Sequence, residues 1–242
     1  MFGFNFDKKI LYIIIAAVVV LFMANMGTDG LMGLLLTLPG VIIAITFHEF
    51  AHAYSAYKLG DDTPLYQGRL NLNPLSHVDP IGLAMLIVAH FGWGKPVQIN
   101  PNNFRGKYSL SASEAIVSVA GPVMNFFVAL VFALIYVLII KFAGIQFMFT
   151  NMGSIILTIV QYTIIVNVGL GVFNLIPLPP LDGSKVLMHF LPYNAKVWFE
   201  SKEHIFYIAF LILFITGIAG DIISPLINTI YSAIMNLVGV LF

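Results

Sequence analysis

The sequence predicts an all-α integral membrane protein with about six transmembrane helices, a short re-entrant segment and a small β element. Hydrophobic residues make up 60% of the 242 residues, charged residues make up only 9%, and the mean hydropathy is +0.96. A typical soluble domain has a charged fraction of about 25%. The composition therefore excludes an ordinary soluble domain, and we expect residues 1–242 to form a single polytopic membrane domain.

Six apolar runs account for the expected spans. A membrane-spanning helix needs about 20 mainly apolar residues. The runs cover residues 10–26, 31–57, 112–141, 150–175, 204–219 and 222–242. The first run follows the sequence MFGFNFDKK with no clear small-residue cleavage site, so we expect a retained span.

The polar region between the second and third spans, residues 58–111, contains the shorter elements. A seventh apolar run at residues 81–91 is too short to cross a bilayer, so we expect it to be re-entrant or interfacial. Residues 66–72 alternate as a strand does, and residues 96–100 form a second short extended run. These two runs predict a small sheet, and ordinary cytoplasmic loops are the alternative.

The distribution of Lys and Arg predicts a cytoplasmic N-terminus. With that orientation, all of the 11 basic residues except Lys141 lie on the cytoplasmic side. The formal net charge is +0, and no basic run suggests a nucleic-acid partner. We therefore expect the chain to reside in a lipid bilayer with residues 58–111 and 176–203 facing the cytoplasm.

The second span contains the motif His48-Glu49-Phe50-Ala51-His52. On a helix, residues four apart share one face, so both imidazoles can bind one Zn²⁺ while Glu49 lies about 100° round the helix, within reach of a water on the metal. This arrangement indicates metal-assisted hydrolysis. The alternative is two unrelated histidines and a buried Glu, which is costly in hydrocarbon because each group needs an internal partner.

A third metal ligand is expected from the end of the fourth span. The chain has no Cys, so ligands must come from His, Asp, Glu or Asn. Pro177, Pro179 and Pro180 prevent continued helix, and the segment they occupy is predicted to be extended. Asp182 follows directly, and its carboxylate would complete a three-ligand site with one position open, as in catalytic zinc sites. An ordinary helix stop explains the prolines but not this carboxylate.

The two motifs resemble those of the site-2 proteases, which are intramembrane zinc metalloproteases. Residues 47–53 carry the HExxH motif, and residues 174–183 match the family pattern NxxPxPxLDG. Further segments are similar to the compact prokaryotic branch without a PDZ domain, namely residues 59–61, 68–74, 77–82, 94–97 and 121–125. The resemblance covers about residues 40–190, and we expect the catalytic core to span residues 31–190.

The resemblance implies a role for each site residue. His48, His52 and Asp182 would bind one zinc ion per chain, Glu49 would be the catalytic base, and Asn174 would help to hold substrate. The expected substrates are transmembrane proteins or peptides, cut within or near their membrane segments. The expected location is a prokaryotic cell membrane, with the active site toward the cytoplasmic side.

Asn125 follows a Gly-Pro pair early in the third span. It is a candidate for substrate contact, and an interhelical hydrogen bond is the alternative. His77 lies in a proline-bounded turn, where interfacial hydrogen bonding is the expected role and metal binding the alternative.

Two other functions are considered. One is a different membrane metalloprotease with HExxH and a distant Glu ligand, although Glu200 and Glu203 lie in a charged, surface-like loop. The other is a metal-ion transporter, which would show ligands on several spans or an internal repeat.

Overall fold

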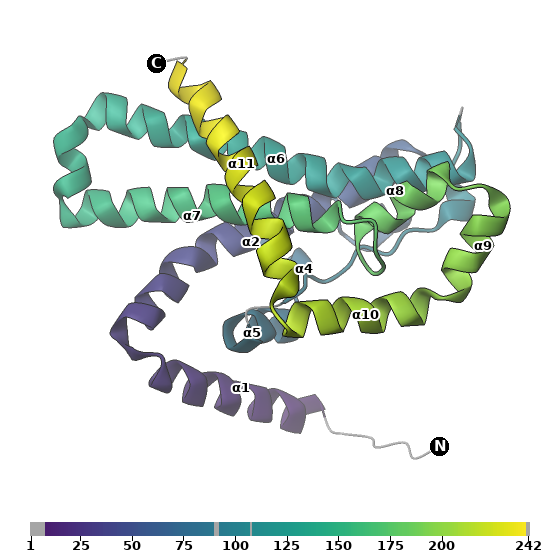
Figure 1. Ribbon diagram of the computed structural model, residues 1–242, viewed down its shortest axis with the longest axis horizontal. Helices are drawn as coiled ribbons and strands as arrows, with labels where there is room; N and C mark the ends of the chain where they lie inside the picture. Colours follow the sequence, from purple (N-terminus) through teal and green to yellow (C-terminus); the bar gives the residue numbers. More distant parts are fainter. Residues whose placement is uncertain (1–7, 90–91, 107, 241–242) are drawn as a thin grey trace.

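The computed structural model describes residues 8–89, 92–106 and 108–240, and most of them are helical (Figure 1). Each predicted span contains a helix: α1 (Lys8–Asn25), α2 (Gly27–Lys58), α6 (Leu110–Ala143), α7 (Asn151–Asn174), α10 (Glu203–Ile215) and α11 (Ile218–Val240). Within the described residues, the 4 helices α2, α6, α7 and α11 are long and apolar enough to cross a membrane. Helix α10 has 13 residues, about 20 Å at 1.5 Å per residue, which is short of a bilayer core. A multi-pass membrane protein is thus confirmed, but six crossings are not.

Helices α2, α6 and α7 pack against one another and form the centre of the molecule. Figure 1 shows α6 and α7 running side by side, connected by η2 (Ile145–Phe149). Small residues allow these helices to approach closely. A Cβ at Gly40 of α2 would lie 2.8 Å from Thr163 Cα of α7, and one at Gly171 of α7 would lie 3.0 Å from the Phe126 ring of α6.

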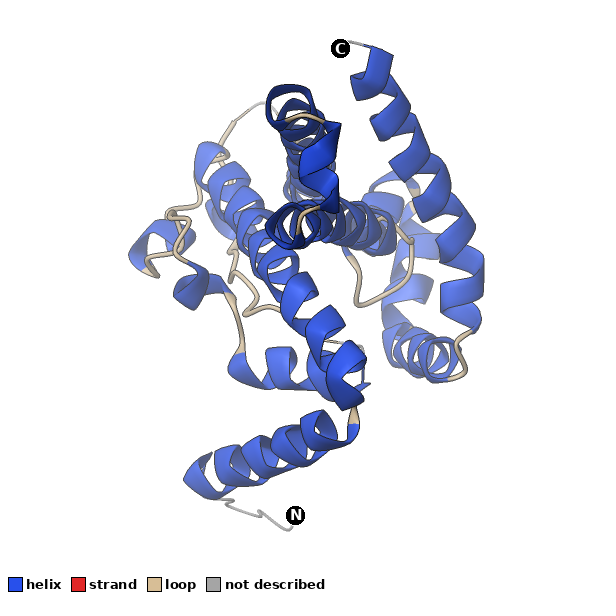
Figure 2. Ribbon diagram, turned by 90° about the vertical axis from the view of Figure 1, so that its left-hand side faces the viewer, coloured by secondary structure: helices blue, strands red, loops and turns tan. Residues whose placement is uncertain are grey.

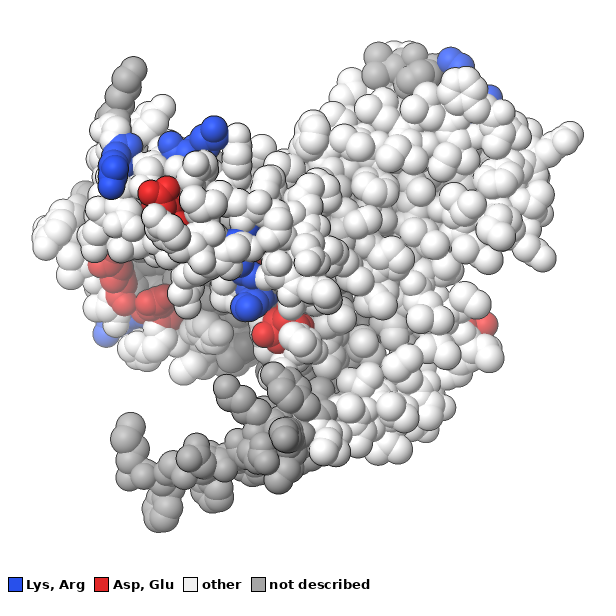
Figure 3. Space-filling model, turned by 180° about the vertical axis from the view of Figure 1, so that it is seen from behind, with Lys and Arg blue, Asp and Glu red and all other residues white. Residues whose placement is uncertain are grey.

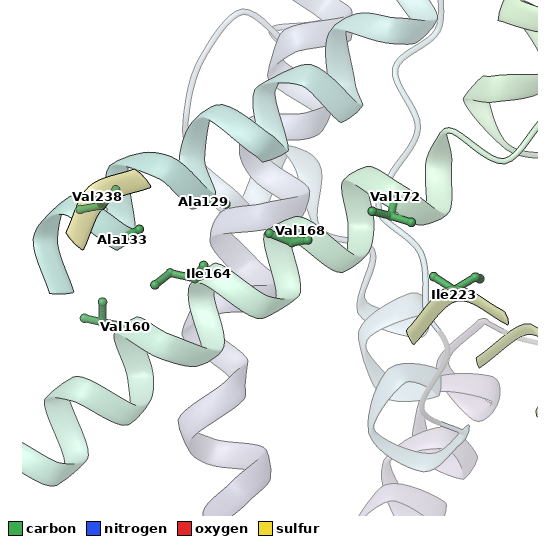
Figure 4. Close-up of a cluster of buried hydrophobic side chains, with 8 residues drawn as sticks. All are labelled: Ala129, Ala133, Val160, Ile164, Val168, Val172, Ile223 and Val238. Carbon is green, nitrogen blue, oxygen red and sulfur yellow. The ribbon is translucent and has the colours of Figure 1, made fainter. Parts of the chain in front are cut away.

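The main apolar cluster joins α6, α7 and α11 (Figure 4). On α7 its members recur at every fourth residue and therefore lie on one helix face. The buried members are Ala129 and Ala133 of α6, Val160, Ile164, Val168 and Val172 of α7, and Ile223 and Val238 of α11. This cluster fixes α7, which carries the start of the 174–183 motif at its end.

The segment between α2 and α6 folds into short helices: α3 (Thr63–Tyr66), α4 (Pro74–His77), α5 (Pro80–Ala89) and η1 (Pro101–Asn103). The predicted re-entrant run is α5, and residues 90–91 at its end lie outside the described residues. Ten residues span about 15 Å, so α5 is too short to cross a bilayer, and it packs beside α1.

The predicted β element is not confirmed, and a strand over residues 66–72 is wrong. The described parts of the chain contain no strand (Figure 2), and the only pairing is a single bridge between Val78 and Gly94. Tyr66 ends α3 instead, and Gly68 adopts a φ of 64°. Asn71 Nδ2 then donates to Gly68 O at 2.6 Å. Turn-forming glycine and asparagine side chains thus override the alternating pattern.

Asp61 ties the two ends of this polar segment together. Its buried carboxylate accepts hydrogen bonds from Thr63 Oγ1 at 2.6 Å, Asn100 N at 2.8 Å and Asn103 Nδ2 at 2.8 Å. Burial alone would raise the pKa of Asp61, but these hydrogen bonds outweigh burial and lower the pKa below its usual value. Asp61 is therefore ionised at neutral pH and holds Asn100 and Asn103 close to the end of α2.

Charged side chains are unevenly distributed over the face of the molecule seen in Figure 3. Figure 3 shows most of the Lys, Arg, Asp and Glu side chains on one side of this view, with a broad uncharged surface over the rest. Large hydrophobic side chains are exposed along the long helices, for example Phe127 on α6, which is 58% exposed. Such exposure is the expected pattern for helices that face lipid.

Candidate metal centre

The HExxH residues and Asp182 meet at one buried point. His48 and His52 lie one turn apart on α2, and Asp182 is the first residue of α8 (Asp182–Phe190). The two Nε2 atoms are 3.0 Å apart, and each is 3.2 Å from Asp182 Oδ2. Within the described residues, this is the only group of three or more His, Cys, Asp or Glu able to hold a metal ion.

The spacing of these three atoms fits a zinc ion. Ligands about 2.0–2.2 Å from a tetrahedral metal lie about 3.3–3.6 Å from one another, slightly farther apart than these atoms. Asp182 Oδ2 is also buried with no hydrogen-bond partner. A buried carboxylate oxygen without a donor is costly unless a cation satisfies it.

The hydrogen bond at Nδ1, on the other side of the His52 ring, also indicates that a metal ion binds at Nε2. His52 Nδ1 lies 2.7 Å from the backbone oxygen of Val117 on α6. A carbonyl oxygen only accepts, so Nδ1 carries the proton, and in the neutral ring Nε2 presents a lone pair toward Asp182. Metal-binding histidines in proteins are oriented in this way by such carbonyls.

The turn after α7 delivers Asp182 to the histidines. Residues 175–181 form tight turns, with Leu178 N donating to Ile176 O at 2.8 Å and Leu181 N donating to Leu178 O at 2.9 Å. The predicted extended conformation is therefore wrong, because the φ that proline fixes is compatible with turns as well as with extended chain. A Cβ at Gly183 would lie 2.3 Å from Leu175 O, so only glycine allows this close approach.

Glu49 and Asn174 face a cavity beside the metal site. The cavity has a volume of about 450 Å³ and is lined by residues of α2, α5, α7 and α10, together with Trp93, Gly94 and Pro96. His48 also contributes to its wall, and most of the other lining residues are apolar. Glu49 Oε2 accepts a hydrogen bond from Val97 N at 3.0 Å. The carboxylate is thus held next to His48 at the edge of an apolar chamber.

The loop that contacts Glu49 is itself held by the side chain of Arg69 and the backbone of His77, both of which are buried. The Arg69 guanidinium donates to Lys95 O, and Lys95 N donates to the backbone oxygen of His77 at 2.7 Å. His77 is fully buried, and its Nε2 is bonded to Asn71 O at 2.7 Å. Burial lowers the pKa of His77, so the ring is neutral near pH 7. His77 is therefore part of the frame of the loop and is not in the metal cluster.

Asn125, the other candidate for substrate contact, lies away from the cavity wall. It is 0% exposed, and its Oδ1 lies 2.7 Å from His48 Nδ1, on the side of the ring away from the cluster. Direct substrate contact is not supported by this burial, whereas the interhelical hydrogen bond considered as the alternative is present. Glu200 and Glu203, the distant ligands of the other metalloprotease type, are exposed on α9 (Tyr193–Ser201) and at the start of α10.

The sequence prediction missed Val117, Gly121 and Asn167. Val117 acts through its backbone carbonyl, which no residue type reveals. A Cβ at Gly121 would lie 2.5 Å from His52 Nε2 and 2.7 Å from His48 Cε1, so this glycine opens the space that the metal needs. Asn167 is a fully buried amide within an apolar span, and that polar residue in a membrane helix was a usable signal.

Comparison with known proteins gives consistent matches. A family model described as peptidase family M50 matches residues 95–216, a range that includes Asp182 but begins after the two histidines. The chain is 37% identical over 202 residues to YwhC of Bacillus subtilis, named as a candidate zinc metalloprotease, covering 84% of this chain and 90% of that protein. The Rip2 protein of Mycobacterium tuberculosis, named likewise, is 26% identical over 74% of this chain and 65% of its own length. The Rip2 protein of Mycolicibacterium smegmatis is 30% identical over 74% of this chain and 66% of its own length. No solved structure matches the chain.

Substitution of Gly121 by Ala should abolish metal binding without unfolding the protein. The added methyl would occupy the space between the two imidazoles, and Ala is favoured over Gly in a helix by up to about 1 kcal/mol. Zinc content of the purified variant should fall at least tenfold, as measured by elemental analysis. Gly169→Ala is the matched control, because its Cβ would meet only Ile227 Cδ1 at 3.6 Å. Full zinc content in Gly121→Ala would contradict the position assigned to the metal.

Proposed function

The chain belongs to peptidase family M50 and is an intramembrane zinc metalloprotease, and we propose that His48, His52 and Asp182 bind its single zinc ion. The observation that carries this proposal is the convergence of two Nε2 atoms and one carboxylate oxygen at 3.0–3.2 Å, one residue away from a Glu that faces a cavity. The proposed catalytic core spans residues 31–190, within one membrane domain that covers residues 1–242.

Glu49 is the proposed general base and acid. When bound, zinc would polarise the scissile carbonyl as a Lewis acid and would lower the pKa of a water molecule. Val97 N holds Glu49 Oε2, which leaves Oε1 to accept a proton from the attacking water. The same carboxyl group then delivers that proton to the nitrogen of the leaving amine as the peptide bond breaks.

The cavity is the proposed binding site for the substrate chain. Its wall is mainly apolar, as expected for a site that receives part of a membrane-embedded segment. Asn174 lines this wall, and its Nδ2 already donates to Leu170 O at 3.0 Å. Its Oδ1 is the proposed acceptor for a backbone N–H of the substrate. The proposed substrates are transmembrane proteins cut within or near their spans, where a locally unwound helix exposes such groups.

The proposed orientation has a cytoplasmic N-terminus, a first crossing by α1 and an active site toward the cytoplasm. The uneven distribution of Lys and Arg supports this orientation, with Lys141 at the end of α6 as the exception. Helix α1 has 18 residues, about 27 Å in length, which approaches the thickness of a bilayer core.

A comparison of two variants separates metal binding from proton transfer. Glu49→Gln keeps the shape of the side chain but cannot accept a proton, so zinc should remain while cleavage of a single-span membrane protein falls at least about 100-fold. Asp182→Ala removes one of three ligands and should lose zinc to a chelator.

The controls are Glu200→Gln and Asp221→Ala, which make the same changes at exposed positions. Both should retain zinc and activity. Near-normal cleavage by Glu49→Gln would exclude Glu49 as the base, and full zinc content in Asp182→Ala would exclude Asp182 as a ligand.

Cysteine labelling tests the orientation, since the chain has no natural Cys. Leu75 is 86% exposed in α4, and Phe149 is 84% exposed in η2. A membrane-impermeant thiol reagent added to intact cells should label Phe149→Cys and should label Leu75→Cys only after the cells are broken. Labelling of Leu75→Cys in intact cells would reverse the proposed orientation.

A further inference from the structure

We propose that Asn125 is a positioning residue that holds His48 in the tautomer required for zinc binding, and that Asn167 holds Asn125 in turn. This inference rests on the proposed zinc site. It concerns a chain of hydrogen bonds that runs from α7 through α6 to α2 and ends on His48 Nδ1.

The direction of each hydrogen bond follows from two backbone carbonyls. Asn167 Nδ2 donates to Thr163 O at 2.8 Å. Because a carbonyl oxygen only accepts, the Asn167 amide nitrogen must face Thr163, and its oxygen must face α6. Asn167 Oδ1 is then the acceptor for Asn125 Nδ2 at 3.1 Å.

Asn125 is fixed in the same way. Its Nδ2 donates to Ala44 O at 3.1 Å as well as to Asn167 Oδ1. A flipped amide would place an oxygen against both of these acceptors, so only one orientation is stable. Asn125 Oδ1 must therefore face His48 Nδ1, which lies 2.7 Å away.

The consequence is that His48 Nδ1 must carry a proton. In the neutral ring, Nε2 then presents its lone pair toward His52 Nε2 and Asp182 Oδ2. Without the acceptor on Asn125, the proton is free to reside on Nε2, where it blocks the metal position. Partners of this kind typically change metal affinity 10–100-fold when they are removed.

Burial distinguishes this series of hydrogen bonds from an ordinary packing contact between helices. Asn125 and Asn167 are each 0% exposed within the helix bundle, so bulk water cannot replace a lost partner. Packing alone would be served equally well by an apolar side chain of similar size. The free-energy cost of burying two amides is explained if their hydrogen bonds fix the tautomer of His48.

The test measures the zinc dissociation constant of the full chain in detergent by competition with a coloured chelator. Asn125→Leu keeps the size of the side chain and removes the acceptor, so zinc should bind 10–100-fold more weakly. Asn125→Asp keeps an acceptor for His48 Nδ1 and should bind zinc more tightly than the Leu variant. A packing role predicts the opposite order, because leucine is tolerated in an apolar interior and a carboxylate is not.

Thr163→Val is the matched control. It removes an equally buried hydroxyl that donates to Ile159 O, and it leaves the backbone oxygen of residue 163 in place. Its zinc affinity should equal that of the unsubstituted chain. A loss as large as that of Asn125→Leu would overturn the proposal.

Equal affinity in Asn125→Leu and the unsubstituted chain would overturn this inference and leave the proposed zinc site intact. Failure of the unsubstituted chain to bind zinc would overturn both.

If neither Asn125 variant folds, ¹⁵N NMR of the metal-free, histidine-labelled chain at alkaline pH tests the tautomer directly. The His48→Gln variant identifies the signal of His48. The Nδ1–H tautomer of His48 is expected, and the Nε2–H tautomer would overturn the proposal.

Discussion

Three unshared lone pairs directed at one point within the protein are the constraint on which the rest of this structure depends. Two imidazole nitrogens and a carboxylate oxygen at 3.0–3.2 Å repel one another unless a cation lies between them. Several features of the fold serve this convergence. Gly121 keeps α6 clear of the rings, the Val117 carbonyl orients His52, and the turn after α7 brings in Asp182.

The same arrangement explains how hydrolysis is possible inside an apolar protein. The two imidazoles lie where α2, α6 and α7 pack together, and Glu49 faces a cavity lined by residues of α2, α5, α7 and α10. Packed helices hold the proposed metal ligands, and a loop held by Arg69 and Asp61 contacts Glu49, the proposed base, through Val97 N. His48 belongs to both the metal cluster and the cavity wall, so the two sites adjoin each other.

The sequence was sufficient for the parts of the site that follow from local geometry. Helical spacing predicted that His48 and His52 share a face. The position of Asp182, directly after the proline-rich segment, predicted its carboxylate as their partner. The strand over residues 66–72 failed because Gly68 and Asn71 favour turns over pairing. The role of Asn125 was ambiguous because it depends on Ala44 and Asn167, which approach it only after three helices have packed. Long-range contacts of this kind are not encoded in residue spacing.

X-ray absorption spectroscopy at the zinc edge tests the central claim most directly. The zinc-loaded chain should show one zinc with two imidazole ligands and the remaining ligands from oxygen, all at about 2.0–2.2 Å. Three or more imidazoles, or a shell of oxygen alone, would contradict the assignment of His48, His52 and Asp182 as the metal ligands.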